Sequence, residues 1–120
     1  MISDGAGMLS AAGMRLVPAG VEWDAVKVGH QLGERVIERL AQLGAVAVDP
    51  AHREPLLYFF VPVGTAADWD VSQTTALGSD AYVVLPPDDR QAPPGPYWLV
   101  TRLHGLTQAE DLRQALEAEQ

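Results

Sequence analysis

The 120-residue sequence contains no cysteine and no asparagine, and it has a single lysine, Lys27, against seven arginines. Without cysteine the chain can form neither a disulfide nor a thiolate metal site, and nothing in it indicates an oxidising or a reducing compartment. The bias towards arginine and away from asparagine is typical of a GC-rich genome, for example an actinobacterial one. This bias concerns the source of the sequence and has no bearing on mechanism.

Positive charge is also scarce, with 8 Lys and Arg residues against 16 Asp and Glu residues and a net charge of −8. Proteins bind nucleic acid largely by neutralising phosphates with lysine and arginine, so this charge counts against a nucleic-acid partner. The same argument counts against an anionic membrane surface. A basic protein partner, or simple solubility, fits the sign of the charge better. Self-association is also expected, because residues 71–77, if they form an edge strand, have few charges to guard it.

Long hydrophobic runs are missing as well. No window reaches the roughly 18 apolar residues that a membrane span requires. Residues 1–13 are mostly small, and they lack the basic start and continuous apolar core of a secretory signal. We therefore expect a flexible tail over residues 1–13, one domain over residues 14–120 and a cytoplasmic location.

Two stretches have the periodicity of helices. Leu32, Val36, Leu40 and Leu43 recur at helical spacing, which predicts a helix over residues 29–43 that Gly44 ends. A second helix is expected from Thr107 onwards, because Thr107 and Glu110 have the spacing of a capping box. Its end carries Glu117 and Glu119, which the helix dipole disfavours, so we expect the last turn to fray.

Between the helices the chain reads as strands. Three apolar segments rich in aromatic and β-branched residues, 55–62, 81–87 and 96–100, are each bounded by proline, glycine or aspartate. Shorter strands are expected at 14–18, 21–28 and 45–48, with an edge strand or extended link at 71–77. The fold class is α+β: a mostly antiparallel sheet of about four to six strands, with two main helices packed on one face.

Part of this strand-rich region resembles the bifunctional DNA primase/polymerase (Prim-Pol) family of the archaeo-eukaryotic primase superfamily. Residues 57–62 (Leu-Tyr-Phe-Phe-Val-Pro) are similar to the family strand His-Leu-Tyr-Phe-Arg-x-Pro. Residues 78–87 and 95–98 are similar to its Gly-Tyr-Val-Val-Ala-Pro-Pro run and closing Tyr-x-Trp strand. The resemblance covers roughly 45 residues and implies a primase palm, in which an Asp-x-Asp pair, a histidine and a later aspartate hold the catalytic metal.

The expected catalytic residues of that family are not found at the matching positions. Leu56 stands where the resemblance places the histidine, and the later aspartate would fall near Thr75. No Asp-x-Asp pair precedes Leu56, since Asp49 is followed directly by Pro50. Metal-assisted phosphoryl chemistry needs those carboxylates to hold and neutralise the cation. We therefore predict no catalytic residue and no cofactor.

One Asp-x-Asp pair occurs elsewhere, at Asp68 and Asp70. On a strand the two carboxylates would share a face and could bind Mg²⁺. The alternative interpretation, which we prefer, is a solvated acidic turn. His30, His52 and His104 have no ligand spacing and are expected at the surface.

Two features are candidates for contact with a partner. The loop 86–95 is stiffened by prolines and carries Asp88, Asp89 and Arg90, although we prefer to interpret it as a rigid hairpin connection. Trp69 lies in a polar turn, where it is either exposed or a lid on the edge of the core. Trp98 is expected in the core.

Together these features favour a non-catalytic protein-interaction or regulatory domain on a degenerate primase-palm-like scaffold. The alternative is a metal-dependent nucleotide-binding or nucleotidyl-transfer protein that uses Asp68 and Asp70. Direct nucleic-acid binding is a third hypothesis, which the charge opposes.

Overall fold

The structure, a computed structural model, describes residues 13–120. The tail expected over residues 1–13 therefore lies outside the described residues, except for Gly13. Within residues 13–120, no helix is long and apolar enough to cross a membrane. The α+β class and the mostly antiparallel pairing are confirmed.

The centre of the fold is a five-stranded antiparallel sheet with the strand order β5-β2-β4-β3-β7. Its strands are β2 (Asp24–Gly29), β3 (Val46–Asp49), β4 (Leu56–Val61), β5 (Thr74–Leu77) and β7 (Tyr97–Val100). The hairpin expected between residues 45–48 and 55–62 is present as β3 and β4. β5 lies at one edge of the sheet, as the edge-strand prediction for residues 71–77 proposed.

The side chains of β4 point alternately to the two faces of the central sheet, and the interior is therefore divided into two cores. Leu57, Phe59 and Val61 point to one face of the sheet, whereas Tyr58 and Phe60 point to the other. Neighbouring residues of a strand always point to opposite faces, so the continuous apolar run of β4 requires cover on both sides.

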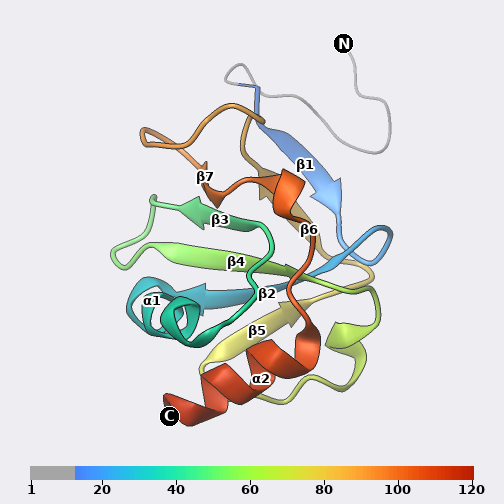
Figure 1. Ribbon diagram of the computed structural model, residues 1–120. Helices are drawn as coiled ribbons and strands as arrows, with labels where there is room; N and C mark the ends of the chain where they lie inside the picture. Colours follow the sequence, from blue (N-terminus) through green and yellow to red (C-terminus); the bar gives the residue numbers. More distant parts are fainter. Residues whose placement is uncertain (1–12) are drawn as a thin grey trace.

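The first face is covered by both helices, α1 (His30–Arg39) and α2 (Ala109–Ala118), which occupy the lower part of the view in Figure 1. Leu32 and Val36 of α1 and Leu112 and Leu116 of α2 pack against Phe59 and the valines of β2 and β3. Gly33 allows α1 to approach closely, because a Cβ atom there would lie 2.4 Å from Leu57 Cδ1. We call this side the helix face.

The second face is covered by a separate two-stranded antiparallel ribbon, β1 (Arg15–Pro18) with β6 (Tyr82–Leu85), seen at the upper right in Figure 1. Val83 and Leu85 are buried against Phe60 and Trp98, while Tyr82 on the outer side of the ribbon is exposed. We call this side the ribbon face. The sequence predicted both strands but not that they would form a second layer.

Two boundary predictions are wrong for local reasons. The first helix ends at Arg39, since Leu40 already has the extended angles φ −83° and ψ 124°. Leu40 and Leu43 nevertheless contact the core, so their spacing reflected burial and not helical structure. The capping box is also absent: the cap residue of α2 is Gln108, with no side-chain hydrogen bond.

Thr107 has a different role from the one predicted. It is buried, and its Oγ1 accepts a hydrogen bond from the Gly44 amide at 2.9 Å. Its own amide donates to the Phe60 carbonyl at 2.8 Å. Thr107 therefore joins the segment before α2 to the central sheet, and a buried polar group with partners of this kind is not free to cap a helix.

The last turn of α2 is held in place, contrary to the expected fraying. Arg35 Nε donates to Glu119 Oε1 at 2.9 Å, and Arg39 donates to the other carboxylate oxygen. These hydrogen bonds from Arg39 and Arg35, together with their charges, lower the pKa of Glu119. A favourable ion pair between two helices thus outweighs the unfavourable helix dipole.

Candidate binding site

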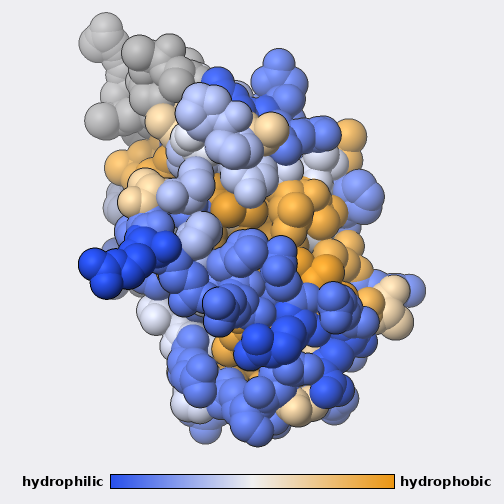
Figure 2. Space-filling view, turned by 90° about the vertical axis from the view of Figure 1, so that its left-hand side faces the viewer, coloured by the Kyte–Doolittle hydropathy of each residue, from blue (hydrophilic) through white to orange (hydrophobic). Residues whose placement is uncertain are grey.

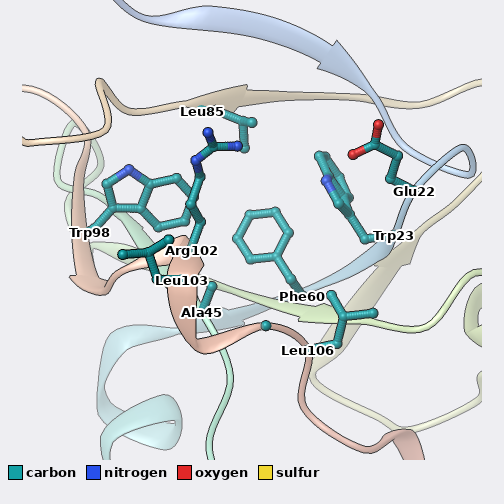
Figure 3. Close-up of a pocket in the computed structure, with 10 residues that line it drawn as sticks. Glu22, Trp23, Ala45, Phe60, Leu85, Trp98, Arg102, Leu103 and Leu106 are labelled. Atoms are coloured by element: carbon teal, nitrogen blue, oxygen red, sulfur yellow. The ribbon is translucent and has the colours of Figure 1, made fainter.

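A cavity of about 370 Å³ opens to solvent on the ribbon face, between the ribbon and the central sheet. Figure 3 shows its lining, which comprises Glu22, Trp23, Ala45, Phe60, Leu85, Trp98, Arg102, Leu103, Gly105 and Leu106. This volume lies within the range of small-ligand and side-chain pockets, about 300–1,000 Å³. We call it the aromatic pocket.

The aromatic residues reach the pocket because of the strand periodicity. Phe60 of β4 lies opposite Ala25 of β2, and Trp98 of β7 lies opposite Ala47 of β3. All four side chains point to the ribbon face, where large rings alternate with alanines. Small residues beside large ones leave space that the short ribbon does not fill.

The rings contact each other in a row. The centroids of Trp23 and Phe60 are 4.8 Å apart with the planes at 88°, and those of Phe60 and Trp98 are 5.7 Å apart at 45°. These are favourable edge-to-face and tilted arrangements. Trp98 is buried as predicted, and its indole Nε1 has no hydrogen-bond partner among the described residues.

The rim of the pocket combines charged and apolar side chains. Glu22 lies beside Trp23, and Arg102 lies beside Trp98 at the other side (Figure 3). Leu103, which follows Arg102 in the short 3₁₀ helix η2 (Arg102–His104), is 92% exposed, and Leu106 is 43% exposed. With the cavity between them and the sheet, these two exposed leucines extend the apolar surface, and contiguous exposed apolar surface is typical of an interaction site.

The loop 86–95 forms one border of this rim through Asp88. It is not a hairpin connection, because it joins β6 of the ribbon to β7 of the central sheet. Asp88 binds Arg102, with the Nε–Oδ1 distance at 3.0 Å. Arg90 is used within the loop, since its Nη1 donates to the Pro94 carbonyl at 2.7 Å, whereas Asp89 is exposed.

Asp68 and Asp70 do not lie on a strand. Asp68 ends the 3₁₀ helix η1 (Thr65–Asp68), and both carboxylates are exposed. Asp70 Oδ1 accepts a hydrogen bond from Arg113 at 3.0 Å. The turn itself is set by the buried Asp24, whose Oδ2 accepts hydrogen bonds from the amides of Gly64 and Ala66 at 3.0 and 2.9 Å.

Trp69 is half-buried at the edge of the helix-face core. Its indole Nε1 donates to Thr74 Oγ1 at 2.8 Å, and the Arg113 guanidinium lies 4.9 Å from its ring centroid. The lid interpretation therefore describes Trp69 better than that of an exposed anchor, because both its polar edge and one face already have partners.

Leu56 and Thr75, the two positions that the primase resemblance assigns to a histidine and an aspartate, lie on strands that are not neighbours, because β2 lies between β4 and β5. Leu56 begins β4 opposite Asp49 of β3, whereas Thr75 lies on the edge strand β5 opposite Lys27. Among residues 13–120, no group of three or more His, Asp or Glu side chains could hold a metal ion.

The histidines make local contacts. His30 lies 3.1 Å from Glu34, and His52 lies 3.2 Å from Asp49, both measured from Nε2 to a carboxylate oxygen.

Burial raises the pKa of Tyr58, and the nearby Asp49 raises it further. The cavity at Tyr58 and Asp49 is only about 110 Å³, which is below the size of ordinary ligand sites.

Sequence reasoning missed most of the aromatic pocket. Trp23, Phe60 and Arg102 were assigned no binding role, although alternation along each strand could have placed Phe60 and Trp98 on a common face. The pairing of β6 with β1, which builds the opposite wall through Leu85, has no local signal in the sequence.

Comparison with known proteins finds no matching protein family, no matching curated protein and no matching solved structure. The resemblance to the Prim-Pol family therefore stays a prediction, and the site has to be interpreted from its own chemistry.

Proposed function

We propose that this protein is a non-catalytic interaction domain, acting as a regulator or structural subunit on a primase-palm-like scaffold. The observation that carries the proposal is the aromatic pocket, an open cavity with aromatic and aliphatic walls and exposed leucines on its rim. A partner inserts one bulky side chain into the pocket, and Leu103 and Leu106 cover it from water. Binding energy in protein interfaces concentrates at anchors of this kind.

The charge of the protein indicates what surrounds that anchor. The net charge is −8, and the rim carries the carboxylate of Glu22 together with Arg102, which is paired with Asp88. A partner segment with basic residues on both sides of its anchor is steered towards such a surface. Figure 2 shows hydrophobic side chains in a band across the middle of one face, with mostly hydrophilic side chains below it.

The alternative, a metal-dependent nucleotide-binding protein that uses Asp68 and Asp70, has less support. Asp70 is already paired with Arg113, and a cation at Asp70 would have to displace that guanidinium. Stabilisation by Mg²⁺ with nucleotide that Asp70→Ala abolishes would favour the alternative.

The test is a comparison of captured proteins between matched leucine variants. Leu103→Asp places a charge on the pocket rim, whereas Leu16→Asp places the same charge on the outer side of the ribbon, where Leu16 is 38% exposed. Quantitative mass spectrometry identifies the proteins that co-purify with wild type and with each variant. We expect a partner that wild type and Leu16→Asp retain and that Leu103→Asp loses at least tenfold. Equal retention by Leu103→Asp would contradict the proposal.

A further inference from the structure

The two sides of the aromatic pocket present the same pattern with opposite charge. On one side, Glu22 is exposed and follows Val21, which is 70% exposed. On the other side, Arg102 is exposed and precedes Leu103, which is 92% exposed. Figure 3 shows Glu22 and Arg102 on either side of the Phe60 ring. Each side of the pocket mouth therefore carries one exposed aliphatic side chain and one charge, and the two charges have opposite sign.

The rings of Phe60 and Trp98 form the floor of the pocket and not its contact surface. They are 3% and 2% exposed, and they contact each other. An approaching molecule therefore meets the rim, where Glu22, Arg102 and Leu103 are exposed, and a cavity of about 370 Å³ that has room for an aliphatic side chain. The choice of partner depends on the rim.

Both rim charges have hydrogen-bonding capacity left for a partner. Glu22 forms no ion pair with another residue in the range 13–120. Arg102 uses Nε and Nη2 for Asp88, at 3.0 Å from Oδ1 and 3.3 Å from Oδ2. A guanidinium has more N–H donors than this contact uses, so those of Nη1 remain. A second carboxylate can therefore bind Arg102 without displacing Asp88.

From this arrangement we infer that the pocket binds a second copy of this chain in a two-fold symmetric dimer. A two-fold axis across the pocket mouth, between its two sides, places Glu22 of each copy against Arg102 of the other. The same axis places Leu103 of each copy against Val21 and the cavity of the other. Each contact occurs twice by symmetry, so the surface is complementary to itself in shape and in charge. This inference rests on the proposed function and identifies the partner's anchor as Leu103.

A basic segment of a different protein is the competing occupant. The net charge of −8 steers such a segment towards the rim, and it repels a second copy at long range. Salt screens long-range repulsion, whereas it screens contact pairs buried in an interface much less. Added salt should therefore leave the association of two copies unchanged or strengthen it, whereas it should weaken the binding of a basic segment.

The test reverses one charge on each side of the pocket. Glu22→Arg alone brings two positive groups together at each contact of a dimer, and Arg102→Glu alone brings two negative groups together. In a mixture of these two variants, both contacts of the mixed dimer again join opposite charges. Sedimentation velocity of the full chain over a concentration series measures self-association, and a fluorophore on the N-terminus of one variant reports the mixed dimer.

We expect wild type to dimerise as its concentration rises, and each single charge variant to dimerise more weakly by about tenfold or more. The mixture should recover the wild-type affinity to within about threefold. Leu103→Asp should abolish the dimer, because it places a charge in the partner's pocket. Leu16→Asp on the ribbon and Glu117→Arg on the exposed surface of α2 are the matched controls, and they should leave the dimer unchanged. Thermal unfolding verifies that each variant is folded.

A wild-type chain that stays monomeric at every concentration would overturn the inference. The capture experiment with Leu103→Asp would then still decide the proposed function, because a different protein can supply the anchor. A dimer that Leu103→Asp and both charge variants retain would overturn the inference in favour of another surface, for which the edge strand β5 is the expected alternative. Loss of the dimer in the charge variants without recovery in their mixture would overturn the pairing of Glu22 with Arg102.

Discussion

The helix face and the ribbon face of the central sheet are built from the same strands but closed to different degrees. On the helix face, valines and leucines from the sheet interlock with both helices around Phe59, which has no exposed surface. On the ribbon face, alanines at positions 25, 45 and 47 lie among the rings of Phe60 and Trp98, and although all five residues are buried, a cavity of about 370 Å³ opens beside them. One face is a closed core, and the cavity on the other is the place where we propose that a partner binds.

The two phenylalanines of the chain allow the largest test of this difference. Phe59 and Phe60 are neighbours on β4 that point to opposite faces. We expect Phe59→Ala to lower the free energy of unfolding by about 3–5 kcal/mol, because it leaves a cavity in a closed core. Phe60 is also buried, at 3% exposed, but its ring borders the pocket, so we expect Phe60→Ala to cost less than Phe59→Ala, at the lower end of this range of about 3–5 kcal/mol.

Chemical denaturation of both variants in parallel provides the measurement. Equal losses, or a larger loss for Phe60→Ala, would show that the ribbon face is packed as tightly as the helix face. The slope of unfolding free energy against denaturant should be the same in both variants, so that the comparison concerns the native state alone.

A smaller effect is expected from Gly33→Ala on the helix face. Helix propensity alone predicts that alanine stabilises α1 by about 1 kcal/mol relative to glycine. A Cβ atom at this position would, however, lie 2.4 Å from Cδ1 of the fully buried Leu57. Overpacking costs about 1–3 kcal/mol, so we expect a net loss of stability in thermal unfolding.

The double variant Gly33→Ala/Leu57→Val is the control for this interpretation. Removing the terminal carbon of Leu57 relieves the clash, so the added alanine should be less costly in the valine background than in wild type. If Gly33→Ala instead raises the melting temperature, the helix face is looser than the structure indicates.

The smallest expected effect is electrostatic and joins the two helices. Since Arg39 and Arg35 lower the pKa of Glu119, the ion pair stabilises the fold fully above the ordinary glutamate pKa of about 4.3. The stabilisation is lost as the pH falls through the lowered pKa of the folded state. The stability difference between wild type and Glu119→Gln should therefore shrink below about pH 4.

Denaturation curves at pH 7 and at pH 3 measure this change, and added salt at pH 7 should also reduce the difference. A stability difference that is independent of pH would mean that Glu119 acts through packing and not through its charge. The Phe59→Ala and Phe60→Ala losses contain no such electrostatic term and should depend much less on pH.

Much of the fold could be predicted from the sequence because its signals are local. The apolar run at residues 55–62 and the Asp49-Pro50 turn predicted the hairpin of β3 and β4, and the leucine spacing predicted the start of α1 to within one residue, although it extended the helix beyond Arg39. Where a local signal competed with a tertiary one, the tertiary one prevailed. Thr107 bonds to Gly44 instead of capping α2, and Glu119 bonds to two arginines instead of leaving a frayed end.

The candidate site could be predicted only in part because it depends on contacts between distant segments. Asp88 was a candidate and does border the pocket, through Arg102. Trp69 was a candidate, but Thr74 and Arg113 occupy its edge and its face. The pairing of β1 with β6 joins residues about 70 positions apart, and the cost of closing such a long loop depends on length and not on any motif.

The most direct test of the account uses the fact that the chain has two phenylalanines, one on each face. Incorporation of 4-fluorophenylalanine gives two ¹⁹F NMR signals, which Phe60→Leu assigns. The captured partner is then titrated against the labelled protein. We predict that the Phe60 signal shifts and saturates while the Phe59 signal stays in place. A partner that binds without moving the Phe60 signal, or that moves the Phe59 signal instead, would contradict the claim that the ribbon face is the binding face.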